Sequence, residues 1–481
     1  MPSWHNHTGN QSSSIAELRK PGSIDEVSQL VAEAEQRGLK VRAVGAGHAW
    51  SDIALTDGIV VDPANLSGLP DLDDGTLRPL PPGGPPLVRV LGGTHIHQLN
   101  EQLRERGLAL RNMGGYDAQT IAGVISTSTH GSGLTFGPFP DMVRSLDLVV
   151  AGGRQVRVEP AGGITDPGAF NAARAPGTWE LIQDDDAFSS AICGLGTLGI
   201  VHSLVLEVRD RFWMNELRNV VAWQQIRDSV TPGGVLKDYE HYELFLNPYA
   251  NKDGTHHVLV TTREQCGEPP GGESPGRGLQ HPLTELEASL PITGFVLRLL
   301  ARHLPGLMIK RFDHVLDDMQ EHDGYRSISY KVFNIGEANH LPAYSMELGV
   351  TLEGNRHLDA VDRILAGAAR WRKQRVYHTS PIALRFVAPS TAYASMMFDQ
   401  PTMMIELIMV TGSRRGEELL AGYERELADL GVRAHWGQVN ALTAQRVREL
   451  YPRWDTWLEA AARFNASGVF DSDFTRRLEI T

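Results

Sequence analysis

The feature that most constrains this chain is a strand that runs directly into a turn of small residues. Residues 41–44 (Val-Arg-Ala-Val) have the composition of a buried strand, and Gly45-Ala-Gly-His48 follows without a break. Two glycines so placed let consecutive backbone N–H groups point inward and bind an anion. A tight turn that carries a surface histidine fits the same spacing. The sequence therefore predicts either an anion-binding loop or a plain turn here.

Composition limits which ligands and partners the chain can have. It has 481 residues, which suggests two or three domains, and its formal net charge is −13. A protein this acidic repels phosphate backbones, so we expect no nucleic-acid partner, and an anionic ligand must be held locally. Two cysteines, Cys193 and Cys266, are too few for a disulfide framework or a cysteine-rich zinc site.

No targeting or membrane segment is visible in the sequence. The first residues lack a basic stretch followed by an apolar run, as a secretory signal would have. The longest apolar stretch, 295–308, is interrupted by Arg298 and Arg302 and falls short of the ~18 apolar residues of a membrane span. We therefore expect a cytoplasmic protein with no membrane partner.

The first 210 residues alternate helices and strands. Ser23-Ile-Asp-Glu26 is typical of a capping box, and apolar residues at helical spacing follow it as far as Gly38. A second unit has a strand at 88–91, Gly92-Gly93 and a helix through Leu99 and Leu103. Further strands are expected at 59–62, 145–150, 155–158 and 200–208.

The middle of the chain has a different pattern of longer strands, which indicates a second domain. Long strands are expected at 242–246, 257–261, 344–352, 382–387 and 403–410, with helices between them. The Gly/Pro-rich segment 268–277 is expected to be the least structured, and the last sixty residues return to a helical pattern.

A glycine pattern at 194–199 matches the G-x-G-x-x-G dinucleotide fingerprint but in the wrong context. That fingerprint requires a strand before it and a helix after it, so that the helix N-terminus faces the pyrophosphate. Here the pattern predicts a helix before Gly194 and a strand after Gly199. We expect a turn that brings backbone close to some other ligand.

Several such clusters occur in a fixed order and together resemble a known family. They are 44–52, 112–115, 119–123, 128–133, 196–200, 435–437, 450–454 and 468–470. The set is similar to the vanillyl-alcohol-oxidase-type flavoproteins, in the branch of sugar-acid lactone oxidases and alditol oxidases. The resemblance implies an α+β fold with three parts: a two-subdomain FAD-binding domain of the PCMH type at 1–212, an α+β substrate cap domain over the isoalloxazine at 213–425, and a C-terminal segment at 426–481 that completes the flavin site.

The resemblance assigns a FAD cofactor and the residues that hold it. His48 matches the histidine that bonds to the flavin 8α-methyl group, with an unattached histidine as the alternative. No cysteine lies in 112–130, which excludes a second, cysteinyl link. Gly114 matches the position that controls access of O2, where oxidases tend to have glycine and dehydrogenases alanine. The full set of cofactor residues is Val44, Gly45, Ala46, Gly47, His48, Ala49, Ser51, Asp52, Gly114, Thr120, Gly123, Ser126, Thr127, Ser128, His130, Gly131, Gly196, Gly199, Ile200, Val201 and His435.

The substrate strands depart from the family pattern. Relatives have glutamate and arginine two residues apart on one strand, and here the pair reads Ala383 and Arg385. The family lysine after His-Trp is replaced by Gln438, and a polar His or Asn is replaced by Glu406. We predict Arg385, Glu406 and Gln438 as catalytic residues, and a substrate pocket formed by Val124, Glu347, Ala383 and Ile408.

Gly114 favours an oxidase, and these substitutions favour a relatively apolar, natural-product-like alcohol as its substrate. A site built to bind many hydroxyl groups loses ~1–3 kcal/mol for each partner removed. We expect hydride transfer from a CH–OH group to flavin and reduction of O2 to H2O2. Arg385 would anchor the substrate oxygen, Gln438 would donate a neutral hydrogen bond, and Glu406 would accept the proton. The alternative for Glu406 is a structural ion pair with Arg385.

Other functions stay open at this point. They are a dehydrogenase with another electron acceptor, an amine or ring-closing oxidation, an aldonolactone or alditol oxidase, and a protein that only binds FAD. The pairs His95/His97 and His256/His257 lack obvious carboxylate partners, so no metal is expected. The expected partners are a small-molecule substrate and O2.

Overall fold

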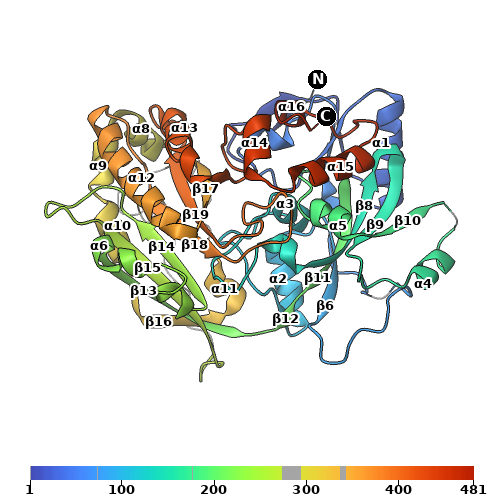
Figure 1. Ribbon diagram of the computed structural model, residues 1–481, viewed down its shortest axis with the longest axis horizontal. Helices are drawn as coiled ribbons and strands as arrows, with labels where there is room; N and C mark the ends of the chain where they lie inside the picture. The colour runs from blue at the N-terminus through green and yellow to red at the C-terminus, as the bar shows by residue number, and fades with distance from the viewer. Residues whose placement is uncertain are drawn as a thin grey trace.

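The computed structural model describes residues 2–72, 74–175, 177–272, 286, 294–335 and 343–480. The first 210 residues form one half of the molecule and a large sheet with its helices forms the other (Figure 1). The chain returns to the first half after the cap sheet, so that both termini lie on it (Figure 1). Segment 268–277, expected to be poorly structured, is described only as far as 272.

A three-stranded parallel sheet opens the first half, in the order β3 (Glu17–Arg19), β5 (Ile59–Val61), β4 (Val41–Ala43). Helix α1 (Ile24–Gln36) connects β3 to β4 along the chain and buries Val27, Leu30 and Val31. Ser23 caps the helix by accepting from the Glu26 N–H, as predicted. The Glu26 carboxylate accepts from the N–H of Gly22 rather than Ser23, so the capping box is displaced by one residue. Gly38, at φ +66°, ends the helix as expected.

A five-stranded sheet follows, in the order β10 (Trp179–Gln183), β9 (Arg154–Glu159), β8 (Val143–Val150), β11 (Ile200–Glu207), β6 (Leu87–Leu91). Helices α2 (Ile96–Glu105), α3 (Ile121–Ser126), α4 (Pro167–Ala172) and α5 (Asp185–Ala191) connect its strands. Helix α5 precedes the glycine turn at 194–199 and strand β11 follows it, which confirms the reversed order predicted from sequence. Two short ribbons complete this half: β1 (Ser3–His5) with β2 (Ser12–Ser14), and β7 (Leu108–Ala109) with β12 (Arg209–Asp210).

The second half is built on an eight-stranded antiparallel sheet, the cap sheet. Its order is β16 (Glu321–Ile328), β13 (Trp213–Ala222), β15 (His257–Cys266), β14 (His241–Leu246), β18 (Ile382–Val387), β19 (Thr402–Val410), β17 (Ala343–Thr351), β20 (Arg433–Ala434). The five long strands predicted for this region are all present. Strand β20 comes from the C-terminal segment and closes one edge.

The two faces of the cap sheet meet different helices. Phe245, Ala383 and Ile408 pack with side chains of α8 (Gly294–His303), α9 (Pro305–Ile309) and α10 (Phe312–Asp318). Leu384 and Leu407 are strand neighbours of Ala383 and Ile408 and point to the opposite face. They belong to the larger core that includes side chains of α12 (Arg356–Lys373) and α13 (Gly416–Glu426). Shorter helices are α6 (Trp223–Ile226) and α11 (Ser329–Phe333).

The C-terminal segment carries α14 (Ala444–Leu450), α15 (Trp454–Phe464) and α16 (Asp473–Arg477) back onto the first half. Trp454 stacks on Trp457 with ring centroids 4.6 Å apart and on Trp436 at 5.9 Å. Trp457 donates to the carbonyl of Cys193, next to the glycine turn. In the described part of the chain, no helix is long and apolar enough to cross a membrane.

Candidate functional site

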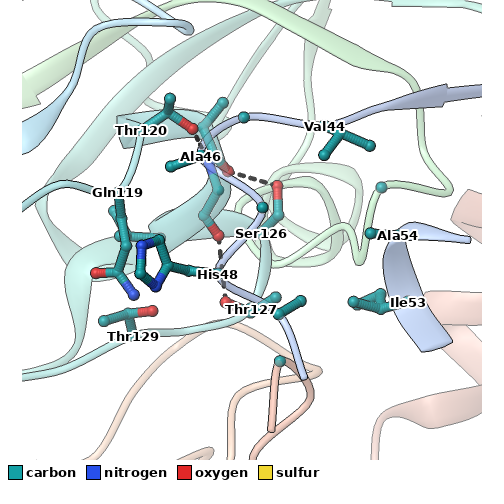
Figure 2. Close-up of a pocket in the computed structure, with 18 of the residues that line it drawn as sticks. Val44, Ala46, His48, Ile53, Ala54, Gln119, Thr120, Ser126, Thr127 and Thr129 are labelled. Carbon is teal, nitrogen blue, oxygen red and sulfur yellow. Dashed lines mark hydrogen bonds between the residues drawn. The ribbon is translucent and has the colours of Figure 1, made fainter. Parts of the chain in front are cut away.

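One pocket extends between the two halves of the molecule (Figure 2). Its walls come mainly from residues 42–54, 114–130 and 195–201, and from residues of the cap and of the C-terminal segment that face them. His48, Gln119 and Thr129 lie together near one end of the view in Figure 2, and Val44, Ile53 and Ala54 lie near the other. The segments that the sequence singled out as small-residue clusters therefore meet around one space.

The turn after β4 has the properties of an anion-binding loop. Gly47 takes φ +66°, and residues 43–50 all line the pocket. The backbone N–H groups of residues 45–49 donate to no group in the described part of the chain. The turn is held from both ends, because the N–H of His7 donates to the Gly47 carbonyl (2.9 Å) and the N–H of Trp50 donates to the Gly437 carbonyl (2.7 Å). A row of free, fixed N–H groups suits a pyrophosphate.

Two residues predicted to contact the cofactor are bonded to the C-terminal segment. Ser51 and Asp52 are outside the residues that line the pocket. The Ser51 hydroxyl donates to the Trp436 carbonyl at 2.6 Å, and the Asp52 carboxylate pairs with Arg477 at 2.7 Å. Both contacts join the turn to the C-terminal segment.

Most of the other predicted cofactor residues line the pocket. They are Val44, Gly45, Ala46, Gly47, His48, Ala49, Gly114, Thr120, Gly123, Ser126, Thr127, His130, Gly196, Gly199, Ile200, Val201 and His435. Ser128 and Gly131 lie behind the wall. Ser128 has φ +58° and its hydroxyl is hydrogen-bonded to that of Ser395. A Cβ at Gly131 would be 2.4 Å from the Asn112 Oδ1, so only glycine fits.

His48 has one ring nitrogen bonded and, among the described residues, no partner at the other. Its Nε2 is 2.8 Å from the Tyr116 hydroxyl, and its ring stacks on His7 with centroids 4.4 Å apart. Burial lowers the pKa of His48 to about 3, so the ring is neutral, and burial raises the pKa of Tyr116 to about 12, so the phenol keeps its proton. The Nδ1 atom has no hydrogen-bond partner among the described residues. These residues fit the FAD expected from the motifs: free N–H groups for the pyrophosphate and a free, neutral imidazole nitrogen.

The cap side of the pocket is centred on Arg385. Its Nε is 2.8 Å from the Glu243 carboxylate, and its Nη1 is 2.9 Å from Glu406 and 3.8 Å from Glu347. The strand register causes this grouping. Glu243 on β14 lies opposite Arg385 on β18, while Glu406 on β19 lies opposite both Ala383 and Glu347. Residues directly opposite each other share one face of a sheet, so all four charges meet at one place.

The charges continue as a buried row across the sheet. Glu243 also accepts from Arg263 on β15 (3.0 Å), which donates to Glu216 on β13 (2.6 Å). Sequence reasoning missed these residues. Glu243 lies in the mostly apolar strand β14, which is a signal for a partnered buried charge. Glu216 and Arg263 lie in strands with several other polar residues, so the sequence does not mark them, and only the strand order identifies the partners.

Burial and charge divide the three carboxylates into two kinds. Burial by itself would raise the pKa of Glu243, but Arg385 and Arg263 outweigh it and lower that pKa to about 2. Burial would also raise the pKa of Glu347, but His130 outweighs burial and that pKa is lowered. For Glu406 burial prevails, with the charge of Glu347 adding to it, and the pKa is raised despite Arg385.

Gln438 and His130 complete the site. Gln438 Nε2 donates to Glu347 Oε2 at 3.1 Å, and His130 Nε2 faces Glu347 Oε1 at 3.2 Å. His130 Nδ1 donates to the Gly131 carbonyl, because a carbonyl can only accept. Burial lowers the pKa of His435 to about 4, so this ring is neutral.

The four predicted substrate-pocket residues separate into two pairs. Val124 and Glu347 line the pocket. Ala383 and Ile408 do not line the pocket, although they lie on the same face of the cap sheet as Glu406. They belong to the apolar cluster with Phe245 and the side chains of α8–α10. The predicted catalytic residues Arg385, Glu406 and Gln438 all line the pocket.

Comparison with known proteins matches both halves of the chain. Residues 16–159 match a FAD binding domain, and residues 206–478 match the D-arabinono-1,4-lactone oxidase family. The chain is 28% identical over 480 residues to the L-gulono-1,4-lactone dehydrogenase of Mycobacterium tuberculosis, covering 99% of both chains. It is 25% identical over 483 residues to a long-chain alcohol oxidase of an uncultured marine euryarchaeote, covering 95% of this chain and 93% of that one. A cholesterol oxidase of B. sterolicum superposes with a TM-score of 0.75 at 14% identity, covering 99% of this chain and 96% of that one, which shows a shared fold.

The depressed pKa of Glu243 predicts a pH-dependent loss of stability in Glu243→Gln. The pKa of Glu243 is about 2 in the folded protein, against an ordinary value of 4.5. Its ionised carboxylate therefore stabilises the fold fully above pH 4.5, and this contribution is lost as the pH falls toward 2. Removing one partner of a buried pair costs about 3–5 kcal/mol. We therefore expect the free energy of unfolding of Glu243→Gln to fall by this order at pH 7, with the difference from wild type narrowing toward pH 2. Urea unfolding across this range measures it.

The matched control is Glu418→Gln, which removes an exposed carboxylate paired with Arg415 on the cap. Exposed pairs contribute about 0–1 kcal/mol, so this variant should track the wild type at every pH. A Glu243→Gln curve that coincides with the Glu418→Gln curve would contradict the role given to the buried row.

Proposed function

Because this chain belongs to the D-arabinono-1,4-lactone oxidase family and is a FAD-dependent oxidoreductase, we propose that it oxidises the CH–OH group of a relatively apolar alcohol. FAD, when bound, accepts the hydride of the alcohol carbon and is reoxidised by O2. The remaining tasks fall to the protein: it binds the alcohol, orients it and takes its hydroxyl proton. The observation that carries the proposal is the meeting of Arg385, Glu406 and Gln438 at the pocket wall.

Arg385 and Glu406 are suited to the two ends of an alcohol O–H bond. The guanidinium of Arg385 is fixed by Glu243 through Nε, and its Nη1 contacts Glu406. A guanidinium held in this way can donate to the substrate oxygen. Glu406, with its raised pKa, is a stronger base than an ordinary carboxylate once it is ionised. Gln438 occupies the position of the family lysine and offers a neutral donor.

The composition of the pocket supports an apolar substrate over a sugar acid lactone. Trp50, Val124 and Ile335 line the same pocket as the charged cluster. Ala383, which stands where relatives have glutamate, has an apolar side chain inside the α8–α10 cluster. A carboxylate at this position would offer a substrate hydroxyl a partner, and Ala383 offers none. A panel of alcohols, lactones, polyols and amines, followed by bleaching of the flavin without O2, tests the substrate class.

Glu406→Gln keeps the shape of the side chain but cannot accept a proton. We expect this variant to bind FAD normally and to reduce it with substrate about 10²–10⁴-fold more slowly than the wild type. Anaerobic stopped-flow absorbance between pH 6 and 9 measures the rate. Glu424→Gln is the control, since it neutralises another half-buried carboxyl away from the pocket. Wild-type rates in Glu406→Gln at every pH would support a purely structural ion pair with Arg385.

We further propose that His48 forms the covalent bond to flavin through its free Nδ1. After acid precipitation of the purified protein, the yellow colour should stay with the wild-type pellet and enter the supernatant for His48→Ala. The variant should still bind FAD before acid is added, because the N–H groups of residues 45–49 are unchanged. His97→Ala, which changes an exposed histidine, should behave as the wild type. Release of all flavin from the wild type would contradict the link.

We propose an oxidase rather than a dehydrogenase, from the glycine at 114. Gly114 lines the pocket. A Cβ at this position would lie 3.1 Å from the His130 carbonyl oxygen, which is a tight contact, and would occupy space at the pocket wall. Gly114→Ala should slow reoxidation by O2 about tenfold, equivalent to ~1.4 kcal/mol in the barrier. Gly162→Ala, where nothing lies within 4 Å, is the control. Reoxidation of the wild type no faster than that of free reduced flavin would favour the dehydrogenase alternative.

A further inference from the structure

Ser345 is a buried hydroxyl at the centre of the catalytic cluster. It lies on β17, two residues before Glu347, and its side chain is on the same sheet face as Glu347 and Glu406. Its Oγ is 2.7 Å from Gln438 Oε1 and 3.1 Å from Glu406 Oε1. Both neighbours are oxygen atoms, and the hydroxyl has one hydrogen to give. One of the two contacts therefore needs a hydrogen from another source.

The orientation of Gln438 decides where the Ser345 hydrogen goes. The Gln438 amide nitrogen is 3.1 Å from Glu347 Oε2 and 3.5 Å from Glu406 Oε1. Reversing the amide would place its carbonyl oxygen against two carboxylate oxygens, so the nitrogen must occupy this side. The amide oxygen then faces Ser345 and can only accept. Ser345 thus donates to Gln438, which leaves the contact between Ser345 and Glu406 without a hydrogen.

A proton on Glu406 Oε1 supplies the missing hydrogen. The other oxygen, Oε2, already accepts from Arg385 Nη1 at 2.9 Å. With Oε1 protonated, each oxygen in the chain has a donor: Glu406 to Ser345, Ser345 to Gln438, and Gln438 to Glu347. Resting on the proposed function of this site, we propose that Glu406 is the neutral acid in the resting protein at neutral pH, and that Ser345 is the positioning residue that holds its proton.

The charges around Glu406 agree with this hydrogen count. Arg385 is the cation in contact with Glu406, and it also serves Glu243 and Glu347. Glu347 faces Glu406 across the β17–β19 pair, and His130 lies beyond Glu347. The neutral His435 adds no positive charge. Glu243 is also balanced by Arg263, whereas Glu406 and Glu347 share Arg385 with it, and protonation of Glu406 relieves its repulsion with Glu347.

The proton has a consequence for the reaction. To act as the base, Glu406 must first lose the Oε1 proton to solvent. The Ser345 hydroxyl can then donate to the Glu406 carboxylate, but Gln438 Oε1 loses its donor when it does so. The bond lost in this exchange favours the protonated form. Flavin reduction should therefore accelerate with rising pH as Glu406 ionises. When Glu406 accepts the proton of the alcohol, it returns to the fully hydrogen-bonded resting state.

Infrared spectroscopy of the FAD-loaded protein tests the proposal without any substrate. The difference spectrum of wild type minus Glu406→Gln should show the C=O stretch of a carboxylic acid at neutral pH, and this band should disappear as pH is raised. Ser345→Ala removes two hydrogen bonds from the protonated state and one from the ionised state. The midpoint of the band's titration should therefore fall by about one pH unit, a tenfold change in proton affinity.

The sign of the shift distinguishes the two directions of the Ser345 hydrogen bond. If Ser345 donated to an ionised Glu406, its removal would move the midpoint upward, which would overturn the proposal. Absence of the acid band from the wild type at neutral pH would overturn it too, and this result does not depend on how Ser345→Ala folds. Ser345→Thr, which keeps the hydroxyl, should restore the wild-type midpoint. Ser327→Ala, which removes another fully buried hydroxyl of the cap sheet, should leave it unchanged.

The infrared result is independent of the proposed function. A protein that oxidises no alcohol can still show the acid band and its shift, in which case the proton assignment stands and the proposed role of Glu406 fails. Where substrate is available, the rising limb of the rate of flavin reduction against pH should move with the infrared midpoint in Ser345→Ala.

Discussion

The chemistry of this protein depends on one arginine held by carboxylates inside an antiparallel sheet. A guanidinium taken out of water is costly unless its donors are occupied and its charge is balanced. Glu243 binds Nε and Glu406 binds Nη1, and both are delivered by strands that neighbour β18. Because the cap sheet sets which residues stand opposite, a slip of one residue in either pairing would send the carboxylate to the other face. The register of three strands is thus the condition for the site.

Much of the fold follows from the sequence because local patterns determine it. Helix α1 has both a capping serine and a terminating glycine, and the long cap strands are apolar runs with few interruptions. The order of small-residue clusters pointed to a vanillyl-alcohol-oxidase-type flavoprotein with an α+β fold, and this family and fold are confirmed. Glycine-rich turns of this kind are informative because a backbone that approaches a ligand closely tolerates few residue types.

The rest of the site depends on long-range pairing, which spacing along the chain does not encode. Glu243 is 142 residues from Arg385, and Ser345 is 93 residues from Gln438. The two predicted substrate-pocket residues that lie outside the pocket, Ala383 and Ile408, were chosen because they match positions that line the site in relatives. These positions lie on the same sheet face as Glu406, but the position of the apolar α8–α10 cluster along that face decides which residues meet the pocket. Ser51 and Asp52 also lie outside the pocket lining, and their partners, near the other end of the chain, are not encoded by spacing.

The attachment of the cofactor turn to the last residues has a consequence for biosynthesis. The N–H of Val41 donates to the Val469 carbonyl, Trp50 is tied to Gly437, and Asp52 is tied to Arg477. A chain emerging from the ribosome presents the turn first and its supports last. The core around α1 includes Val469 and Phe470, so the N-terminal half and its turn gain their final shape only after the C-terminal segment has been released. Capture of the cofactor is in this way postponed to a stage at which the whole polypeptide exists, and a chain shortened by a few tens of residues would retain the complete glycine motif without the means to hold it in place.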